Sequence, residues 1–105
     1  MFLETIEKKQ LTFDRKKLTD KELLEIYDKL LHPRLIEEKM LSMLRQGRIS
    51  KWFSGIGQEA VAVGAALAME ADEYILPMHR NLGVFTTRGV PMARLFSQFQ
   101  GTANG

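Results

Sequence analysis

The residues best suited to binding or catalysis lie at 78–81, where a histidine and an arginine are adjacent. Arg80 is the first cation after Lys51, in a stretch that is otherwise nearly free of charge. An arginine in such a position usually has an anionic partner, because its planar fork matches carboxylate and phosphate groups. That partner is either the phosphate of a ligand or an internal carboxylate. From the residues alone, we consider these two alternatives equally well supported. The internal candidates are Glu59, Asp72 and Glu73.

Other patterns resemble functional motifs without completing one. Residues 54–59 contain two glycines, as phosphate-binding loops do, but Glu59 would repel a phosphate, so we interpret the stretch as a turn into a helix. The two histidines are far apart and share no metal-ligand spacing. Glu37 and Glu38 are adjacent, so they point in different directions on a helix and do not form a carboxylate pair. The absence of cysteine excludes a disulfide scaffold, a thiolate zinc site and a cysteine nucleophile.

The elements that must position these residues begin with a long helical pattern, which follows a polar leader or arm at residues 1–18. Thr19 and Glu22 have the spacing of a capping box, and apolar residues then recur at helical intervals. Pro33 removes one hydrogen-bond donor, so we expect a kink or two abutting helices. Gly47 is expected to end this helical run.

The second half of the chain predicts two short strands and three further helices. The helix over 58–69 is apolar on all sides and rich in small residues, so we expect it to be buried on every face. The other elements can barely enclose such a helix, and residues 101–105 form a loop with no closing element. We therefore expect an incomplete domain, completed by further sequence or a partner chain. The expected strands are 49–53 and 74–76, and the expected helices are 58–69, a short one through Phe85 and Thr87 to Gly89, and 92–100.

Composition limits the class of protein. The chain has 105 residues, of which 45% are hydrophobic and 27% charged, and this balance indicates one small globular domain rather than a disordered chain. The net charge is +2 and acids interrupt every basic cluster, so we expect no nucleic-acid partner. The N-terminus is not a signal peptide and no apolar run approaches a membrane span, so we expect no membrane partner. These features fit the mitochondrial matrix or the bacterial cytoplasm, and we favour the latter.

Three blocks of sequence, taken together, resemble the E1 alpha components of 2-oxoacid dehydrogenase complexes. The resemblance covers roughly residues 20–105 and is specific through the order and spacing of the blocks. The first block looks more like the branched-chain members than the pyruvate members. The blocks are RQGRIS at 45–50, GQEA at 57–60 with VG at 63–64, and HRNLG at 79–83 with TRG at 87–89.

The resemblance implies an α/β thiamine-diphosphate-binding fold with a central parallel sheet. Residues 19–105 would be its mostly helical N-terminal part, comprising the leading helices and the first strand. The implied cofactors are thiamine diphosphate and Mg²⁺, whose ligands are expected beyond residue 105, because the family's G-D-G motif is absent here. The implied partners are an E1 beta subunit or a fused beta half, and a lipoyl-bearing E2, in an oligomeric assembly.

The resemblance also assigns roles to three residues. Arg80 matches the arginine that contacts the cofactor diphosphate. His79 stands where the family usually has tyrosine, also a diphosphate contact, and either side chain can donate a hydrogen bond. Phe53 falls where the family places a side chain near the substrate pocket, although core packing of Phe53 and Trp52 is the alternative. No catalytic acid or base is expected in this segment.

We therefore expect the N-terminal segment of an E1 alpha component, inactive on its own. The implied reaction is oxidative decarboxylation of a 2-oxoacid with acyl transfer to the lipoyl group of E2, and branched-chain substrates are favoured. Pyruvate and acetoin are the alternatives within the family. The rival from another class is a small helical interaction module without catalysis, which would not explain why the three blocks occur together.

Overall fold

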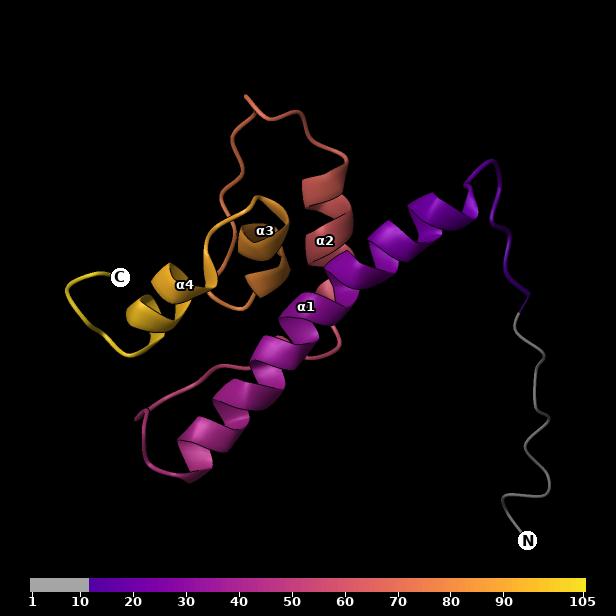
Figure 1. The fold of residues 1–105 in the computed structure, drawn as a ribbon. Helices are drawn as coiled ribbons and strands as arrows, with labels where there is room; N and C mark the ends of the chain where they lie inside the picture. Colours follow the sequence, from indigo (N-terminus) through magenta and orange to yellow (C-terminus); the bar gives the residue numbers. More distant parts are fainter. Residues whose placement is uncertain (1–11) are drawn as a thin grey trace, which may run out of the picture.

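The computed structural model describes residues 12–105, and these residues form four helices and no strand (Figure 1). The predicted leader at 1–18 lies outside the described residues as far as residue 11, and residues 12–18 contain one turn and no regular element. The mostly helical character expected of this segment is therefore confirmed. The helices are α1 (Asp20–Arg45), α2 (Glu59–Leu67), α3 (Leu82–Thr87) and α4 (Met92–Phe99).

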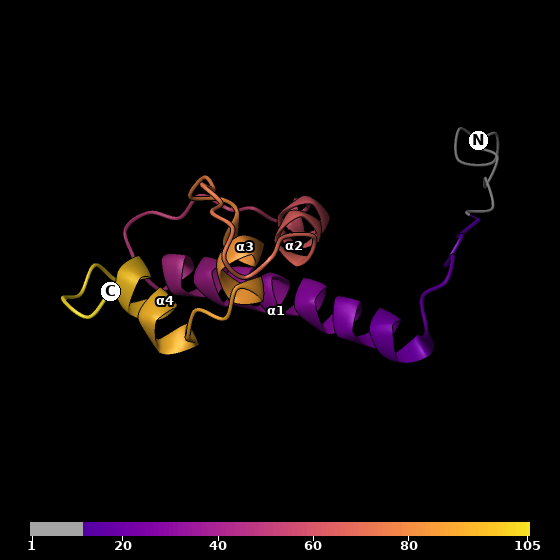
Figure 2. The ribbon, with the colours of Figure 1, turned by 90° about the horizontal axis from the view of Figure 1, so that it is seen from above.

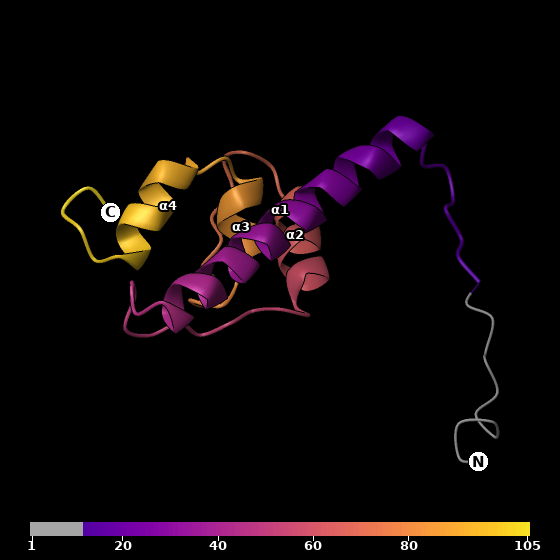
Figure 3. The same ribbon diagram turned by 60° about the horizontal axis from the view of Figure 1, so that its bottom comes forward.

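The long helix α1 is the element on which the others are arranged (Figure 3). Its predicted N-cap is confirmed, because the Thr19 hydroxyl accepts a hydrogen bond from the backbone N–H of Glu22 at 3.2 Å. The predicted end is confirmed too: Gly47 has φ +72°, a left-handed conformation that suits glycine, and lies just past the C-cap. The expectation of two abutting helices is wrong, because α1 is continuous through Pro33. The Pro33 ring is buried, and its packing offsets the lost hydrogen bond.

Helices α2 and α3 pack against each other and against the same side of α1 (Figure 2). Small side chains on α2 make this possible, and Ala62, Val63 and Ala66 are buried. The opposite face of α2 is open: Val61 is 75% exposed and Leu67 45%. Within residues 12–105 no described element covers this outer side, so the described residues alone do not bury the helix on every face.

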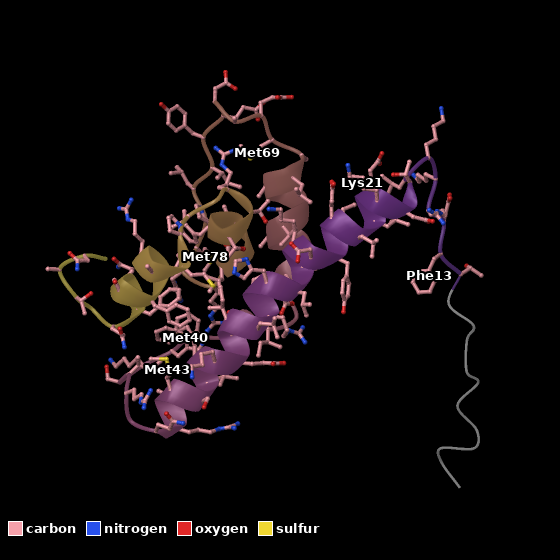
Figure 4. The ribbon with its side chains drawn as sticks, in the orientation of Figure 1. Phe13, Lys21, Met40, Met43, Met69 and Met78 are labelled. Carbon is pink, nitrogen blue, oxygen red and sulfur yellow. The ribbon has the colours of Figure 1, made fainter. Side chains whose placement is uncertain are left out.

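The core lies between the C-terminal half of α1 and the segments that follow it. Figure 4 labels Met40 and Met43, which are buried on the inner side of α1. Side chains from α3 and α4 complete this core, and aromatic residues surround it. The buried members are Ile36, Met40, Met43, Ile49, Leu82 and Leu95, with Trp52, Phe85, Phe96 and Phe99 packed around them.

Both predicted strands are absent from the part of the chain that the structure describes. Residues 49–53 and 74–76 run without regular hydrogen bonding, and Tyr74 and Leu76 are 95% and 97% exposed. A strand is stabilised by backbone bonds to a neighbouring strand, and residues 12–105 supply none. The helices expected over this segment are thus present, whereas no strand is formed within residues 12–105.

None of the helices in residues 12–105 combines the length and apolarity that crossing a membrane requires.

Candidate functional site

The three residues assigned to the site by resemblance lie together. Two loops bring them there: Phe53 is in the loop before α2, and His79 and Arg80 are in the turn before α3. The rings of Phe53 and His79 meet edge to face, with centroids 5.2 Å apart. The guanidinium carbon of Arg80 lies 5.8 Å from the Phe53 centroid, within the range of a cation–π contact. All three side chains are exposed, so they are accessible to a ligand.

A pocket of about 350 Å³ opens beside Phe53 and His79. Trp52 forms part of its wall and packs edge-on against Phe99, with centroids 4.7 Å apart. Core packing therefore accounts for the half-buried Trp52, whereas the 53% exposed Phe53 faces the site. No carboxylate lines this pocket. Its lining residues are Lys51, Trp52, Phe53, His79, Phe85, Gln98 and Phe99.

Arg80 pairs with none of the carboxylates that the sequence suggested. The ion pairs recorded among residues 12–105 are those of Arg15 with Asp20 and of Arg34 with Glu59, so Glu59 is already engaged elsewhere. A different arginine, Arg88, holds the turn at residues 70–73 through the backbone carbonyls of Glu70 and Glu73. The guanidinium of Arg80 therefore makes no ion pair within the described residues, and its fork can serve a ligand.

Glu59 closes the turn into α2, as the sequence predicted for residues 54–59. One carboxylate oxygen accepts a hydrogen bond from the Gly57 N–H at 2.8 Å, and the other accepts from the Arg34 guanidinium. The bond from Arg34 lowers the pKa of the Glu59 carboxyl below its ordinary value, and the same bond raises the pKa of Arg34. The turn is thus tied to α1 by an ion pair, and no phosphate is needed to explain its glycines.

Glu37 is a residue at the site whose importance the sequence analysis missed. Its side chain is 2% exposed, and its carboxylate accepts three hydrogen bonds from the loop that carries Phe53. The signal was its place on α1: Glu37 lies four residues after the buried Pro33 and three before the buried Met40, on an otherwise apolar face. A charged residue on such a face requires partners, because an unpaired buried charge is costly.

The arrangement is suited to holding an anion rather than to acid–base chemistry. Arg80 presents a bidentate fork, His79 can donate one further hydrogen bond, and Lys51 adds a cation on the pocket wall. Within residues 12–105, no three His, Asp or Glu side chains gather as a metal site would require. The donor set of Arg80 and His79 fits a phosphate or diphosphate group, such as that of thiamine diphosphate.

The chain is similar to known proteins over most of its length. Residues 27–105 match the family model described as "Dehydrogenase E1 component". The chain is 31% identical over 88 residues to the pyruvate dehydrogenase E1 component subunit alpha of Staphylococcus aureus strain Mu50. It is 30% identical over 88 residues to the subunit of the same name from Staphylococcus epidermidis strain RP62A. Each alignment covers 84% of this chain and 24% of the relative.

No solved structure matches the chain significantly. The family match covers most of the chain, and it includes the segment from Phe53 to Arg80 that forms the site. These findings confirm the resemblance to E1 alpha components that the three sequence blocks suggested. The chain belongs to the dehydrogenase E1 component family.

Proposed function

We propose that this segment forms one edge of a thiamine diphosphate site in an enzyme that oxidatively decarboxylates a 2-oxoacid and passes the acyl group to a lipoyl-bearing E2. The observation that carries the proposal is the exposed pair His79 and Arg80 in one turn, with no carboxylate bound to the guanidinium within residues 12–105. An arginine left without an internal anion, beside a second donor, is suited to a phosphorylated ligand.

In this proposal the residues of the chain bind and orient the cofactor. The Arg80 guanidinium and the His79 ring would hold the diphosphate by donating hydrogen bonds to its oxygens. When bound, thiamine diphosphate supplies the carbanion stabilisation that decarboxylation requires. Phe53 lies beside both donors and also lines the pocket, so its ring is next to both parts of the site. The Mg²⁺ ligands and the catalytic acid and base come from residues outside this segment.

The substrate we favour is a branched-chain 2-oxoacid. The pocket beside Phe53 measures about 350 Å³ and is lined by four aromatic side chains together with Lys51, His79 and Gln98, which leaves room for more than the methyl group of pyruvate. Pyruvate is the second candidate, because the relatives in Staphylococcus are named pyruvate dehydrogenase subunits. Rates of decarboxylation by the complete enzyme with 2-oxoisovalerate, pyruvate and acetoin decide among the three.

The proposal includes a beta subunit, or a fused beta half, and an oligomeric enzyme. The apolar surface left uncovered in this segment supports it. Val61 on α2 and Tyr74, Leu76 and Met78 before α3 are all more than 60% exposed. Large exposed apolar side chains that gather on a surface mark regions that other protein covers.

The experiment that tests the cofactor site is substitution of Arg80 in the complete enzyme. Loss of a charge-assisted hydrogen bond costs roughly 1.5–3 kcal/mol, so Arg80→Ala should weaken thiamine diphosphate binding by about ten- to a hundredfold. Arg80→Lys should fall in between, because lysine is a point charge without the fork. His79→Phe should have a smaller effect. Calorimetric titration of thiamine diphosphate with Mg²⁺ measures each Kd.

Arg94→Ala is the matched control, because Arg94 is an exposed arginine on α4 that does not line the pocket beside Phe53. It should bind thiamine diphosphate as the wild type does. Equal Kd values for wild type and Arg80→Ala would contradict the proposed role. In that case any effect of Arg80→Ala would appear in thermal stability measured without cofactor.

A further inference from the structure

The carboxylate of Glu37 is buried in α1 and is bound entirely by one loop. Its Oε2 accepts hydrogen bonds from the indole Nε1 of Trp52 at 2.7 Å and from the Ser54 hydroxyl at 3.2 Å. Its Oε1 accepts from the backbone N–H of Gly55 at 2.9 Å. The residue is 2% exposed, so these bonds are shielded from water and are not screened as surface contacts are.

Two of these partners flank Phe53 directly. Trp52 and Ser54 bind Glu37 on either side of Phe53 in the sequence, whereas the Phe53 ring is 53% exposed and contacts His79 and Arg80. The ring meets His79 at 5.2 Å and lies under the guanidinium of Arg80. Glu37 therefore fixes the position of Phe53, around which the candidate site is built. The Glu37 carboxylate itself binds the neighbours of Phe53 rather than its ring.

The third partner connects Glu37 to Arg80 through the backbone. A Cβ atom added to Gly55 would collide with the carbonyl oxygen of Arg80, so the two main chains are in direct contact there. The same Gly55 donates its N–H to Glu37. A shift of the loop at Gly55 would consequently move the main chain at Arg80 as well.

Little room exists for another group to replace the carboxylate. The cavity between Glu37, Gly55 and Arg80 has a volume of about 10 Å³, at the lower limit for one water molecule. A side chain of the same size but different hydrogen-bonding capacity would therefore leave at least one donor without an acceptor, and a buried unpaired donor is costly.

We propose that Glu37 is a positioning residue for the site, which sets the placement of Phe53 and Arg80 relative to each other through its bonds to Trp52, Ser54 and Gly55. The proposal rests on the proposed function in one respect, since it takes Arg80 and His79 to bind the cofactor diphosphate. Glu37 touches neither cofactor nor substrate, and it acts only through the loop.

Glu37→Gln tests this because it keeps the size of the side chain and changes only its chemistry. Both Glu37 oxygens accept bonds from N–H donors, whereas one end of a glutamine is an NH₂ group. That NH₂ must then face either the Trp52 indole N–H or the Gly55 N–H, and the loop moves away from α1. Glu38→Gln is the matched control, since it makes the same change at the adjacent, exposed position.

Two measurements on the complete enzyme are required. The first is the ¹⁹F resonance of Trp52 in protein labelled with fluorotryptophan, identified by its loss in Trp52→Phe; it should shift in Glu37→Gln and stay in place in Glu38→Gln. The second is calorimetric titration of thiamine diphosphate with Mg²⁺ into folded protein. We expect Glu37→Gln to weaken binding by about tenfold, as the loss of one well-aligned hydrogen bond would.

Ser54→Ala provides a milder variant in case Glu37→Gln does not fold. It removes one of the three donors and should weaken cofactor binding by a few-fold at most. A shifted Trp52 resonance with wild-type Kd values in every folded variant would overturn the proposal, because Glu37 would then only support the fold. Arg80→Ala binding like wild type would instead defeat the proposed function, so the two failures are distinguishable.

Discussion

Residues 52–55 and residues 74–78 both lack regular secondary structure and both lead into the candidate site, yet they are held by different contacts. In the first segment, two side chains and one backbone N–H bind a single buried carboxylate. In the second, Tyr74, Leu76 and Met78 extend into solvent. The first segment thus obtains its position from α1, whereas the second presents an apolar surface that no described residue covers.

The second segment is held mainly near its ends. Arg88 donates hydrogen bonds to the carbonyls of Glu70 and Glu73, and the Asn81 side chain accepts one from the Met78 N–H at 2.8 Å. The comparison shows that a loop can be positioned without a sheet if one side chain satisfies its polar groups. It also shows that contacts within residues 12–105 position residues 52–55 more fully than they position residues 74–78.

The largest effect is expected where the first segment touches the turn that follows the second, at Gly55 and Arg80. In Gly55→Ala the new Cβ would collide with the Arg80 carbonyl oxygen, and the neighbour is backbone, which cannot move aside easily. We expect a loss of about 1–3 kcal/mol in the free energy of unfolding of the complete protein, measured by denaturant titration.

Gly64→Ala is the control for this substitution. Gly64 lies in α2, and nothing lies within 4 Å of an added Cβ. Alanine there should increase stability by about 0.5–1 kcal/mol, because it favours the helix. If both alanines changed stability equally, the contact between Gly55 and Arg80 would not be a close one.

A smaller effect is expected at the second segment. Arg88→Ala removes two hydrogen bonds to carbonyls, which together contribute about 1 kcal/mol at an exposed position. Amide hydrogen exchange at residues 70–78 should therefore accelerate by about fivefold, while exchange at 52–55 stays unchanged. Arg94→Ala should alter neither region. Equal acceleration in both segments would mean that they are not held independently.

The smallest effect concerns the turn after the first segment. The bond from Arg34 lowers the pKa of Glu59 in the folded protein, so the stabilisation is present above the unfolded pKa of 4.5 and is lost as the pH falls through the lower folded value. The Arg34 side chain is 41% exposed, so the effect is reduced by solvent.

Denaturant unfolding of the wild type and Glu59→Gln from about pH 7 to pH 3 measures this difference. The two free energies of unfolding should converge at acid pH, because protonated Glu59 no longer attracts Arg34. Arg34→Ala should reproduce the behaviour of Glu59→Gln. A constant difference between wild type and Glu59→Gln over the whole range would show that the ion pair contributes nothing.

The helices could be predicted from the sequence because their signals are local. The cap at Thr19, the glycine at position 47 and the periodic apolar residues of α1 and α4 all depend on neighbours within a few positions. The strands could not be predicted reliably, because an apolar run such as 74–76 forms a strand only beside another strand. The expected break at Pro33 considered only the backbone hydrogen bond that proline removes from a helix. The packing of the Pro33 ring is a tertiary effect, which the local sequence does not reveal.

For the site, the residues themselves predicted an anionic partner for Arg80 but left its identity open. The grouping with His79 and Phe53 was expected only through the family resemblance, and the structure brings these side chains together. Glu37 was considered only as half of a carboxylate pair with Glu38. Its true partners are 15–18 residues away in sequence, a separation at which helical spacing makes no prediction.

Three hydrogen-bond donors, at positions 52, 54 and 55, bind the one carboxylate at position 37. Amino-acid substitutions at these four positions are therefore expected to occur together or not at all. Removing the acceptor alone leaves buried donors unpaired, whereas replacing the acceptor and its partners by apolar groups of similar shape can be nearly neutral. A chimera of two related chains that takes α1 from one parent and the following loop from the other should therefore be tolerated only where both parents carry compatible residues at these positions. Recombination points between residues 37 and 55 are the ones to avoid in engineering this segment.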